Sequence, residues 1–226
     1  MAHPVFDAVR RAAFEPLAWF AVRGDDRLPG VAAVVLIGNA GPKMFERFAA
    51  ERNPHADRLD DWTRDVVDPL AASLAARAVY PFDTPPLPFL TWARRGGGGH
   101  VSPLGLNVHP AFGLWHAYRA ALLFPADPDL PPTPSSASPC ETCAARPCLS
   151  SCPVHAFAAG GYDIDACVGH LHSDRGAQCR EGGCLARHAC PVGEAHAYLP
   201  GQAQFHMRAF LVAHPALARC DGIVNT

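Results

Sequence analysis

Apolar and polar residues recur along the first 130 residues with periods that predict short helices and strands in alternation. A helix is expected over Val5 to Phe14, and a strand around Leu17 to Val22. The β-branched run Val31 to Ile37 is typical of a strand that is buried on both faces. A glycine-containing turn then leads to a helix expected over Met44 to Arg52.

Two further helices are expected before residue 80. Asp57 is placed to cap the first, and Asp68-Pro69 is expected to begin the second. A shorter helix should follow from Leu87 to Ala93, and the glycines from Gly96 to Gly99 predict a flexible loop.

The last element of this region is a long strand expected over Phe112 to Phe124. Strict alternation places two sets of side chains on opposite faces: His116, Tyr118, Ala120 and Leu122 on one, and Trp115, Ala117, Arg119 and Ala121 on the other. The mixture of helices and strands indicates an α+β fold that begins with an α/β layered domain.

Prolines and serines from Pro125 to Pro139 favour an extended linker over a packed element. We therefore expect one domain over residues 1–130 and a smaller one over residues 131–226. Few regular elements are expected in the second domain before a closing helix over Gln202 to Arg219.

Composition narrows the classes of function. Of the 226 residues, 49% are hydrophobic and 18% are charged, and the formal net charge is −2. These values are ordinary for a globular protein, and they lack the excess of basic residues that is typical of nucleic-acid-binding proteins. The longest apolar runs are too short to span a bilayer, and the first 20 residues lack the pattern of a signal peptide. We therefore expect a cytoplasmic protein that has no membrane partner.

Eight of the nine cysteines gather between residues 140 and 190, in two groups that each end in Cys-Pro. Bacterial two-cluster ferredoxins end their cysteine runs in the same way, and eight thiolates are what two four-iron clusters need. We predict a ferredoxin-like domain with two [4Fe–4S] clusters. In a crossed assignment, the first is held by Cys140, Cys143, Cys148 and Cys190, and the second by Cys152, Cys167, Cys179 and Cys184.

Two other uses of these cysteines stay open. Disulfides are at odds with a reducing cytosol. A zinc site would account for the pair Cys140-x2-Cys143, but zinc ribbons do not require a repeated Cys-Pro step. Cys220 stands apart and is expected to be a free thiol.

Two segments of the first domain could either bind a ligand or only shape the chain. Gly38 to Pro42 lies between a strand and a helix, where backbone amides can meet a ligand. It lacks the P-loop lysine and the glycine order of dinucleotide-binding proteins. His109 to Gly113 is either a turn closed by hydrophobic residues or the rim of a pocket.

The segment from Leu104 to Leu123 resembles cobalamin-processing proteins of the CblC type. The resemblance covers residues 31 to 132 and implies a nitroreductase-like or flavin-reductase-like fold. In that fold a corrinoid (cobalamin) pocket would be lined by His109, Pro110, Phe112, Gly113, Trp115 and Arg119. If flavin is bound instead, Arg119 would pair with its phosphate.

The second domain looks like the ferredoxin module of epoxyqueuosine reductase, in which a cobalamin-binding domain is joined to two four-iron clusters. Cys167 matches the cysteine that falls between the two halves of that motif. Asp83-Thr84-Pro85-Pro86 resembles a segment of the reductase in which an acidic group is a candidate proton donor. A helix-capping role for Asp83 fits the sequence at least as well.

Together these resemblances imply an iron–sulfur protein that passes electrons from two clusters to a corrinoid, with a cobalamin-linked reductase as the expected activity. A ferredoxin-type carrier without corrinoid and a corrinoid-binding chaperone are the alternatives. The implied partners are a small-molecule substrate and an electron donor such as a flavodoxin, a ferredoxin or a reductase. A tRNA substrate is not expected, because the chain has a single lysine, Lys43, and ends soon after its closing helix.

Overall fold

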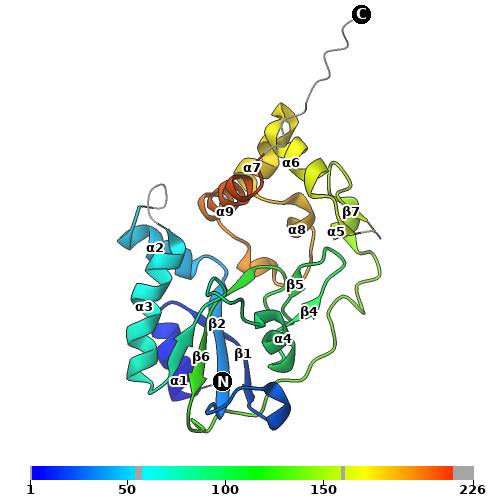
Figure 1. Ribbon diagram of the computed structural model, residues 1–226. Helices are drawn as coiled ribbons and strands as arrows, with labels where there is room; N and C mark the ends of the chain where they lie inside the picture. Colours follow the sequence, from blue (N-terminus) through cyan, green and yellow to red (C-terminus); the bar gives the residue numbers. More distant parts are fainter. Residues whose placement is uncertain (1, 54–57, 159–160, 216–226) are drawn as a thin grey trace, which may run out of the picture.

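The computed structural model describes residues 2–53, 58–158 and 161–215 (Figure 1). Its first half contains a four-stranded antiparallel sheet in the order β1, β2, β6, β3. These strands span Glu15–Ala21 (β1), Ala33–Ala40 (β2), Arg77–Val79 (β3) and His116–Phe124 (β6). β2 lies inside the sheet and is buried along almost its whole length, which confirms the prediction from its β-branched sequence.

Helices cover both faces of this sheet (Figure 1). On one face lie α1 (Pro4–Arg11), α2 (Lys43–Glu51) and α3 (Leu59–Ser73), whose Phe48 and Trp62 form a core with Ile37. On the other face lies α4 (Phe89–Arg95), whose Trp92 forms a second core with Leu36. This arrangement confirms the α+β class.

The two helices expected between residues 57 and 74 are one continuous helix, α3, with Pro69 inside it. Pro69 removes one backbone N–H, but Pro69 and Asp65, the residue four positions earlier, are both exposed, so water can satisfy the freed carbonyl. Trp62 and Ala71 stay buried on either side of the proline. The predicted break was wrong because packing on the sheet continues across it. The expected cap, Asp57, lies outside the described residues.

The long final strand is shorter than expected and is interrupted by a β-bulge at Arg119. Ile37 pairs with Ala120, but the next residue, Gly38, pairs with Tyr118. Tyr118 therefore packs against the α4 side of the sheet, whereas Ala120 packs on the side of α3. The strict alternation predicted across this strand was wrong, because a bulge inserts one residue and reverses the side-chain order beyond it.

The glycine run from Gly96 to Gly99 is a packed segment, so the prediction of a flexible loop was wrong. A Cβ atom at Gly98 would lie 2.3 Å from the carbonyl oxygen of Leu17, and the amide of Trp19 donates to the carbonyl of Gly96. Glycine is needed here because the two backbones approach too closely for a side chain. A small hairpin follows, formed by β4 (His100–Val101) and β5 (Asn107–Val108).

The proline-rich segment has no helix or strand and runs over the surface of the first half. The Trp19 indole Nε1 donates to the carbonyl of Pro131 at 2.9 Å, and His3 Nε2 lies 3.1 Å from the carbonyl of Asp129. A domain boundary near residue 131 stays a prediction, and we use "first domain" and "second domain" for residues 1–130 and 131–226.

The second domain contains more regular structure than expected, in short elements. They are α5 (Pro147–Ser150), β7 (Phe157–Ala158), β8 (Gly161–Tyr162), α6 (Ile164–His172), α7 (Ala177–Gly182), α8 (Leu185–His188) and α9 (Pro200–Ala213). Single 3-10 turns occupy Gly24–Asp26, Asp174–Gly176 and Glu194–His196.

The closing helix ends six residues before the expected Arg219. Its last residue is Ala213, and Pro215 follows two positions later. A residue that precedes proline is disfavoured in the helical conformation, which accounts for the early end. None of the helices in the described ranges is both long enough and apolar enough to cross a bilayer.

Candidate metal centres

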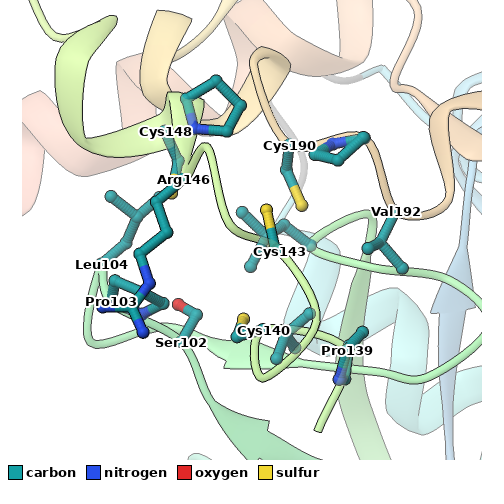
Figure 2. A pocket seen from close by; sticks show the side chains of 14 residues that line it. Ser102, Pro103, Leu104, Pro139, Cys140, Cys143, Arg146, Cys148, Cys190 and Val192 are labelled. Carbon is teal, nitrogen blue, oxygen red and sulfur yellow. The ribbon is translucent and has the colours of Figure 1, made fainter.

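The first cavity lies where the second domain meets the β4–β5 hairpin (Figure 2). It has an empty volume of about 390 Å³, and four cysteines line it: Cys140, Cys143, Cys148 and Cys190. Apolar side chains of the first domain, including Leu104, Val108 and Leu114, form another part of its wall. The cavity is therefore bounded by residues from both domains.

The second cavity lies within the second domain and has an empty volume of about 330 Å³. The remaining four cysteines line it: Cys152, Cys167, Cys179 and Cys184. Phe157 of β7, Leu171 of α6 and Met207 of α9 complete its apolar wall.

These two groups of four have the same members as the crossed assignment made from the sequence. The single helical turn α5 places two neighbouring cysteines in different cavities. Cys148 lies within this turn and lines the first cavity, whereas Cys152 follows the turn and lines the second. Conversely, Cys190 is far from Cys140 in the sequence but lines the same cavity. The assignment of these thiols as ligands remains a prediction.

The thiols of both cavities are available as ligands. All eight cysteines are free thiols in the structure, with no disulfide among them. Within the described residues, no three His, Cys, Asp or Glu side chains converge to hold a single ion. Instead, each set surrounds an apolar space, as four thiolates around an iron–sulfur cluster would.

Burial affects the ionisation of these thiols. It raises the pKa of five of them: Cys140, Cys148, Cys167, Cys179 and Cys184. Removal from water disfavours the thiolate, and neighbouring thiolates add repulsion. Metal binding would have to displace these protons, so assembly of a cluster should release protons.

Two groups around the second cavity are placed to donate to sulfur. The amide of Ala156 donates to Cys152 Sγ at 3.4 Å. Burial and an interaction with Cys167 raise the pKa of Tyr162, so its hydroxyl stays protonated. Tyr162 is held on the β7–β8 hairpin, where its ring stacks on Phe157 at 4.8 Å. Hydrogen bonds of this kind tune the potential of metal–sulfur centres.

The segment from His109 to Gly113 is a closed turn that supports the domain interface. His109 Nε2 lies 3.0 Å from the carbonyl of Leu17, and its Nδ1 accepts hydrogen bonds from the amides of Ala111 and Phe112. Both ring nitrogens are therefore occupied within the protein. Burial lowers the pKa of His109 to about 4, so the ring is neutral.

Three other predicted pocket residues, Phe112, Gly113 and Trp115, contact the second domain. Phe112 packs edge-on against His196 at 4.8 Å, and a Cβ atom at Gly113 would lie 1.8 Å from the carbonyl oxygen of Val192. Trp115 is buried and packs against Tyr198. None of the predicted pocket residues His109, Pro110, Phe112, Gly113, Trp115 and Arg119 lines either cysteine cavity.

Arg119 faces α3, as the bulge in β6 allows. Its guanidinium donates to Asp60 at 2.5 Å and to the Thr63 hydroxyl at 3.2 Å, while its Nε atom is buried without a partner in the described structure. The guanidinium also lies 5.9 Å from the ring centre of Phe82.

Asp83 lies near the same aromatic ring but does not cap α4, which begins at Phe89 with Pro88 as its cap residue. One Asp83 oxygen accepts from Arg64 at 2.5 Å, and the other accepts from the amide of Tyr80 at 2.8 Å. Arg64 lies over the rings of Tyr80 and Phe82. The helix-capping alternative was therefore wrong, and the role of Asp83 as a proton donor stays a prediction.

A polar cluster that the sequence analysis missed surrounds Tyr198, between α9 and one end of the sheet. The Asn39 amide donates to the Tyr198 hydroxyl at 2.7 Å, and the Gln202 amide donates to the carbonyl of Gly41. His206 packs on the Tyr198 ring, and burial lowers the pKa of His206 to about 4. The Tyr198 cluster joins residues more than 150 positions apart, with no sequence pattern to relate them.

The cluster also explains the turn from Gly38 to Pro42. The Gly41 amide donates to the carbonyl of Trp115 at 2.9 Å, and its φ of 70° favours glycine. Both polar backbone groups of Gly41 are thus used within the protein, which supports the reading of this segment as a structural turn.

No protein-family model matches this chain, and no curated protein matches it significantly. Among solved structures, epoxyqueuosine reductase from Streptococcus thermophilus aligns over 88% of this chain and 69% of that chain, with a TM-score of 0.52 and 14% identity. The enzyme from Bacillus subtilis aligns over 75% of this chain at 19% identity, with a TM-score of 0.46.

A structure of epoxyqueuosine reductase with a modified tRNA-Tyr stem loop aligns over 85% of this chain at 17% identity, with a TM-score of 0.46. This chain spans 50% of the length of the Bacillus subtilis protein. The alignment with the Streptococcus thermophilus protein shows that this chain is similar in fold to epoxyqueuosine reductase.

Proposed function

We propose that this chain is an iron–sulfur redox protein that holds two [4Fe–4S] clusters. The observation that carries the proposal is the division of eight cysteines into two sets of four, each around its own apolar cavity. When bound, such clusters supply one-electron transfer at potentials that the protein tunes. A protein electron donor such as a flavodoxin, a ferredoxin or a reductase is the proposed partner, in a reducing compartment.

The role of each domain follows from the walls of the cavities. The second cavity is enclosed by the second domain alone, whereas the first domain closes the first cavity through the β4–β5 hairpin and Leu114. A redox group in the first cavity would thus directly adjoin the first domain. This suits a protein whose first domain holds the electron acceptor.

We propose a corrinoid as that acceptor, bound near the Tyr198 cluster. The resemblance to cobalamin-processing proteins supports this, and so do unpartnered buried polar atoms in the described structure: Asn39 Oδ1, Trp115 Nε1, Arg119 Nε, Gln202 Oε1 and His206 Nε2. Such atoms need partners. The amide groups around a corrinoid ring can both donate and accept hydrogen bonds. In this arrangement Arg119 binds the corrinoid. His109, Phe112 and Gly113 stabilise the interface between the two domains.

Reduction of epoxyqueuosine in tRNA is a second candidate activity, favoured by the similarity in fold to epoxyqueuosine reductase. The charge of the chain weighs against it, because a net charge of −2 provides little attraction for phosphates. A corrinoid-linked reductase with a small substrate is therefore the function we propose first.

Anaerobic purification followed by analysis of iron, sulfide and zinc tests the clusters. About eight irons and eight sulfides per chain are expected. Zinc without sulfide would overturn the proposal.

Titration with cob(II)alamin, followed by EPR and visible absorption, tests the corrinoid. Binding should change the cobalt spectrum. Gln202→Leu should weaken the affinity for the corrinoid about tenfold, because it leaves a corrinoid amide without a partner. Gln204→Leu is the matched control, because Gln204 is exposed on the same helix. An unchanged cobalt spectrum with both clusters present would reduce the function to that of an electron carrier.

The same preparation can be tested for the tRNA candidate. Binding of a tRNA-Tyr stem loop carrying epoxyqueuosine, and its turnover with a reductant, would favour the second activity over the first. If the stem loop is neither bound nor turned over, the reductase with a small substrate is the favoured function.

A further inference from the structure

Ser102 brings a hydroxyl group from the first domain into the wall of the first cysteine cavity (Figure 2). The other first-domain residues in that wall, Pro103, Leu104, Val108 and Leu114, are apolar. We propose that Ser102 donates a hydrogen bond to a sulfur atom of the redox group held in this cavity, and so raises its reduction potential. The inference rests on the proposed function.

Backbone hydrogen bonds hold Ser102 directly after the end of β4. Its amide donates to the carbonyl of Leu106 at 2.9 Å, and its carbonyl accepts from the amide of Gly105 at 2.9 Å. These two bonds close the turn of the hairpin. The backbone of Ser102, and with it the Cβ atom, is therefore held in place beside the cavity.

The hydroxyl of Ser102 has no partner within the described structure. The residue is only 6% exposed, and its Oγ atom is buried without a hydrogen bond. A buried hydroxyl in this state is costly, and native proteins nearly always provide it with a partner. The missing partner has to lie in the space that the hydroxyl faces.

The polar groups around this space favour sulfur as the acceptor. Ser102, Ser138, Cys140, Glu141 and Arg146 line one open recess next to the first cavity. The Ser138 hydroxyl already accepts from the amide of Cys140 at 3.3 Å, and Glu141 is exposed to solvent, whereas the Ser102 hydroxyl is buried. Arg146 carries only donors, so it cannot accept from the hydroxyl. Figure 2 shows the Ser102 oxygen between the end of the Arg146 side chain and the Cys140 sulfur in this view. A thiolate or sulfide at this position can accept the bond.

A hydrogen bond to sulfur stabilises the more negative, reduced state of an iron–sulfur cluster, so its loss lowers the potential. For Ser102→Ala we expect the equilibrium constant for one-electron reduction of this cluster to fall about tenfold, which corresponds to a shift of about 59 mV to more negative potential. The cluster in the second cavity has no contact with Ser102 and should keep its potential.

An anaerobic redox titration followed by EPR measures both potentials in the same sample. Ser102→Thr and Ser102→Val form a matched pair of similar shape, of which only Thr keeps the hydroxyl. Thr should retain the original potential of the first cluster, whereas Val and Ala should lower it. If the Ala variant fails to assemble its cluster, the Thr and Val variants still distinguish the effect of the hydrogen bond from the effect of side-chain packing.

Several outcomes would overturn the inference. Equal potentials for the Thr and Val variants would show that the hydroxyl has no role, and an equal shift of both clusters would indicate a general change in structure. Iron and sulfide analysis keeps this failure separate from failure of the proposed function. A wild-type chain that lacks clusters refutes the proposed function itself, whereas two intact clusters that are insensitive to Ser102 refute only the hydrogen bond.

Discussion

The Arg187 guanidinium of α8 donates hydrogen bonds from two nitrogens to the backbone carbonyl of Leu114, with Nε at 2.9 Å. The two residues are 73 positions apart and belong to different domains. The same guanidinium lies 4.9 Å from the ring centre of Trp115 and 4.4 Å from that of Tyr198. Arg187 thus joins the cysteine-bearing domain to the turn that precedes β6.

Removal of Arg187 should loosen this interface. We expect Arg187→Ala to lower the free energy of unfolding by about 2–3 kcal/mol, because charge-assisted hydrogen bonds and a ring contact are lost together. Denaturant unfolding measures the change. Arg175→Ala, at an exposed position of the same domain, should have little effect. Similar losses for both variants would contradict the special role of Arg187.

The crossed arrangement of cysteines predicts different products for neighbouring substitutions. Cys152→Ala should remove the cluster of the second cavity, and Cys148→Ala should remove that of the first, each leaving about four irons per chain. EPR of the reduced proteins should then show two different remaining signals. Loss of the same signal in both variants would mean that ligands are grouped by sequence instead.

Replacement of Asp83 tests its proposed role in proton transfer. Asp83→Asn should abolish reductase turnover while it costs less than about 1 kcal/mol of stability, because its ion pair with Arg64 is partly exposed. The asparagine oxygen can still accept from the Tyr80 amide, so the turn is retained. Full turnover with the cofactor bound would remove Asp83 from the mechanism.

Acid should destabilise the fold through a buried histidine. Burial lowers the pKa of His116 to about 3, well below its ordinary value of 6.5. Below pH 6.5 His116 binds a proton in the unfolded chain but not in the folded chain. The free energy of unfolding therefore falls as the pH decreases toward 3. For this single group the loss at pH 5.5 is about 1.4 kcal/mol.

Denaturant midpoints at pH 7.5 and pH 5.5 would measure this effect. His116→Gln should reduce the difference between the two midpoints, since glutamine does not titrate. An undiminished difference in the variant would assign the acid sensitivity to other groups.

Two glycines of similar backbone conformation should respond differently to alanine. Gly113 has a φ of 56°, and an added Cβ would lie 1.8 Å from the carbonyl oxygen of Val192. Gly105 has a φ of 72°, with no atom within 4 Å of an added Cβ. Gly105→Ala should cost about 1 kcal/mol of backbone strain, whereas Gly113→Ala should cost more than about 3 kcal/mol by separating the domains. Thermal unfolding would show whether the two costs differ.

Local patterns in the sequence predicted the parts of the structure that depend on near neighbours. The β-branched run predicted a buried central strand, and repeated Cys-Pro steps predicted two sets of cysteines. The continuous helix through Pro69 was not predicted, because packing of Trp62 and Ala71 on the sheet outweighs a local break. The bulge at Arg119 depends on the pairing of β6 with β2 and leaves no mark in the strand itself.

The interface residues were harder to predict for the same reason. His109 to Trp115 stood out as a motif, but the sequence could not distinguish a pocket rim from a docking turn. The contacts of Arg187 with Leu114 and of Asn39 with Tyr198 could not be predicted either, because each joins distant segments. Ser102 was missed because a lone serine in a short hairpin has no recognisable pattern.

The composite wall of the first cavity makes completion of this site depend on the docking of the two domains. Leu104 and Val108 are made early in synthesis, whereas Cys190 is made late, and all three border the same space. The chain can complete this site only after its two halves have docked. Any group held in this cavity is therefore fully enclosed only in a chain whose two halves are docked.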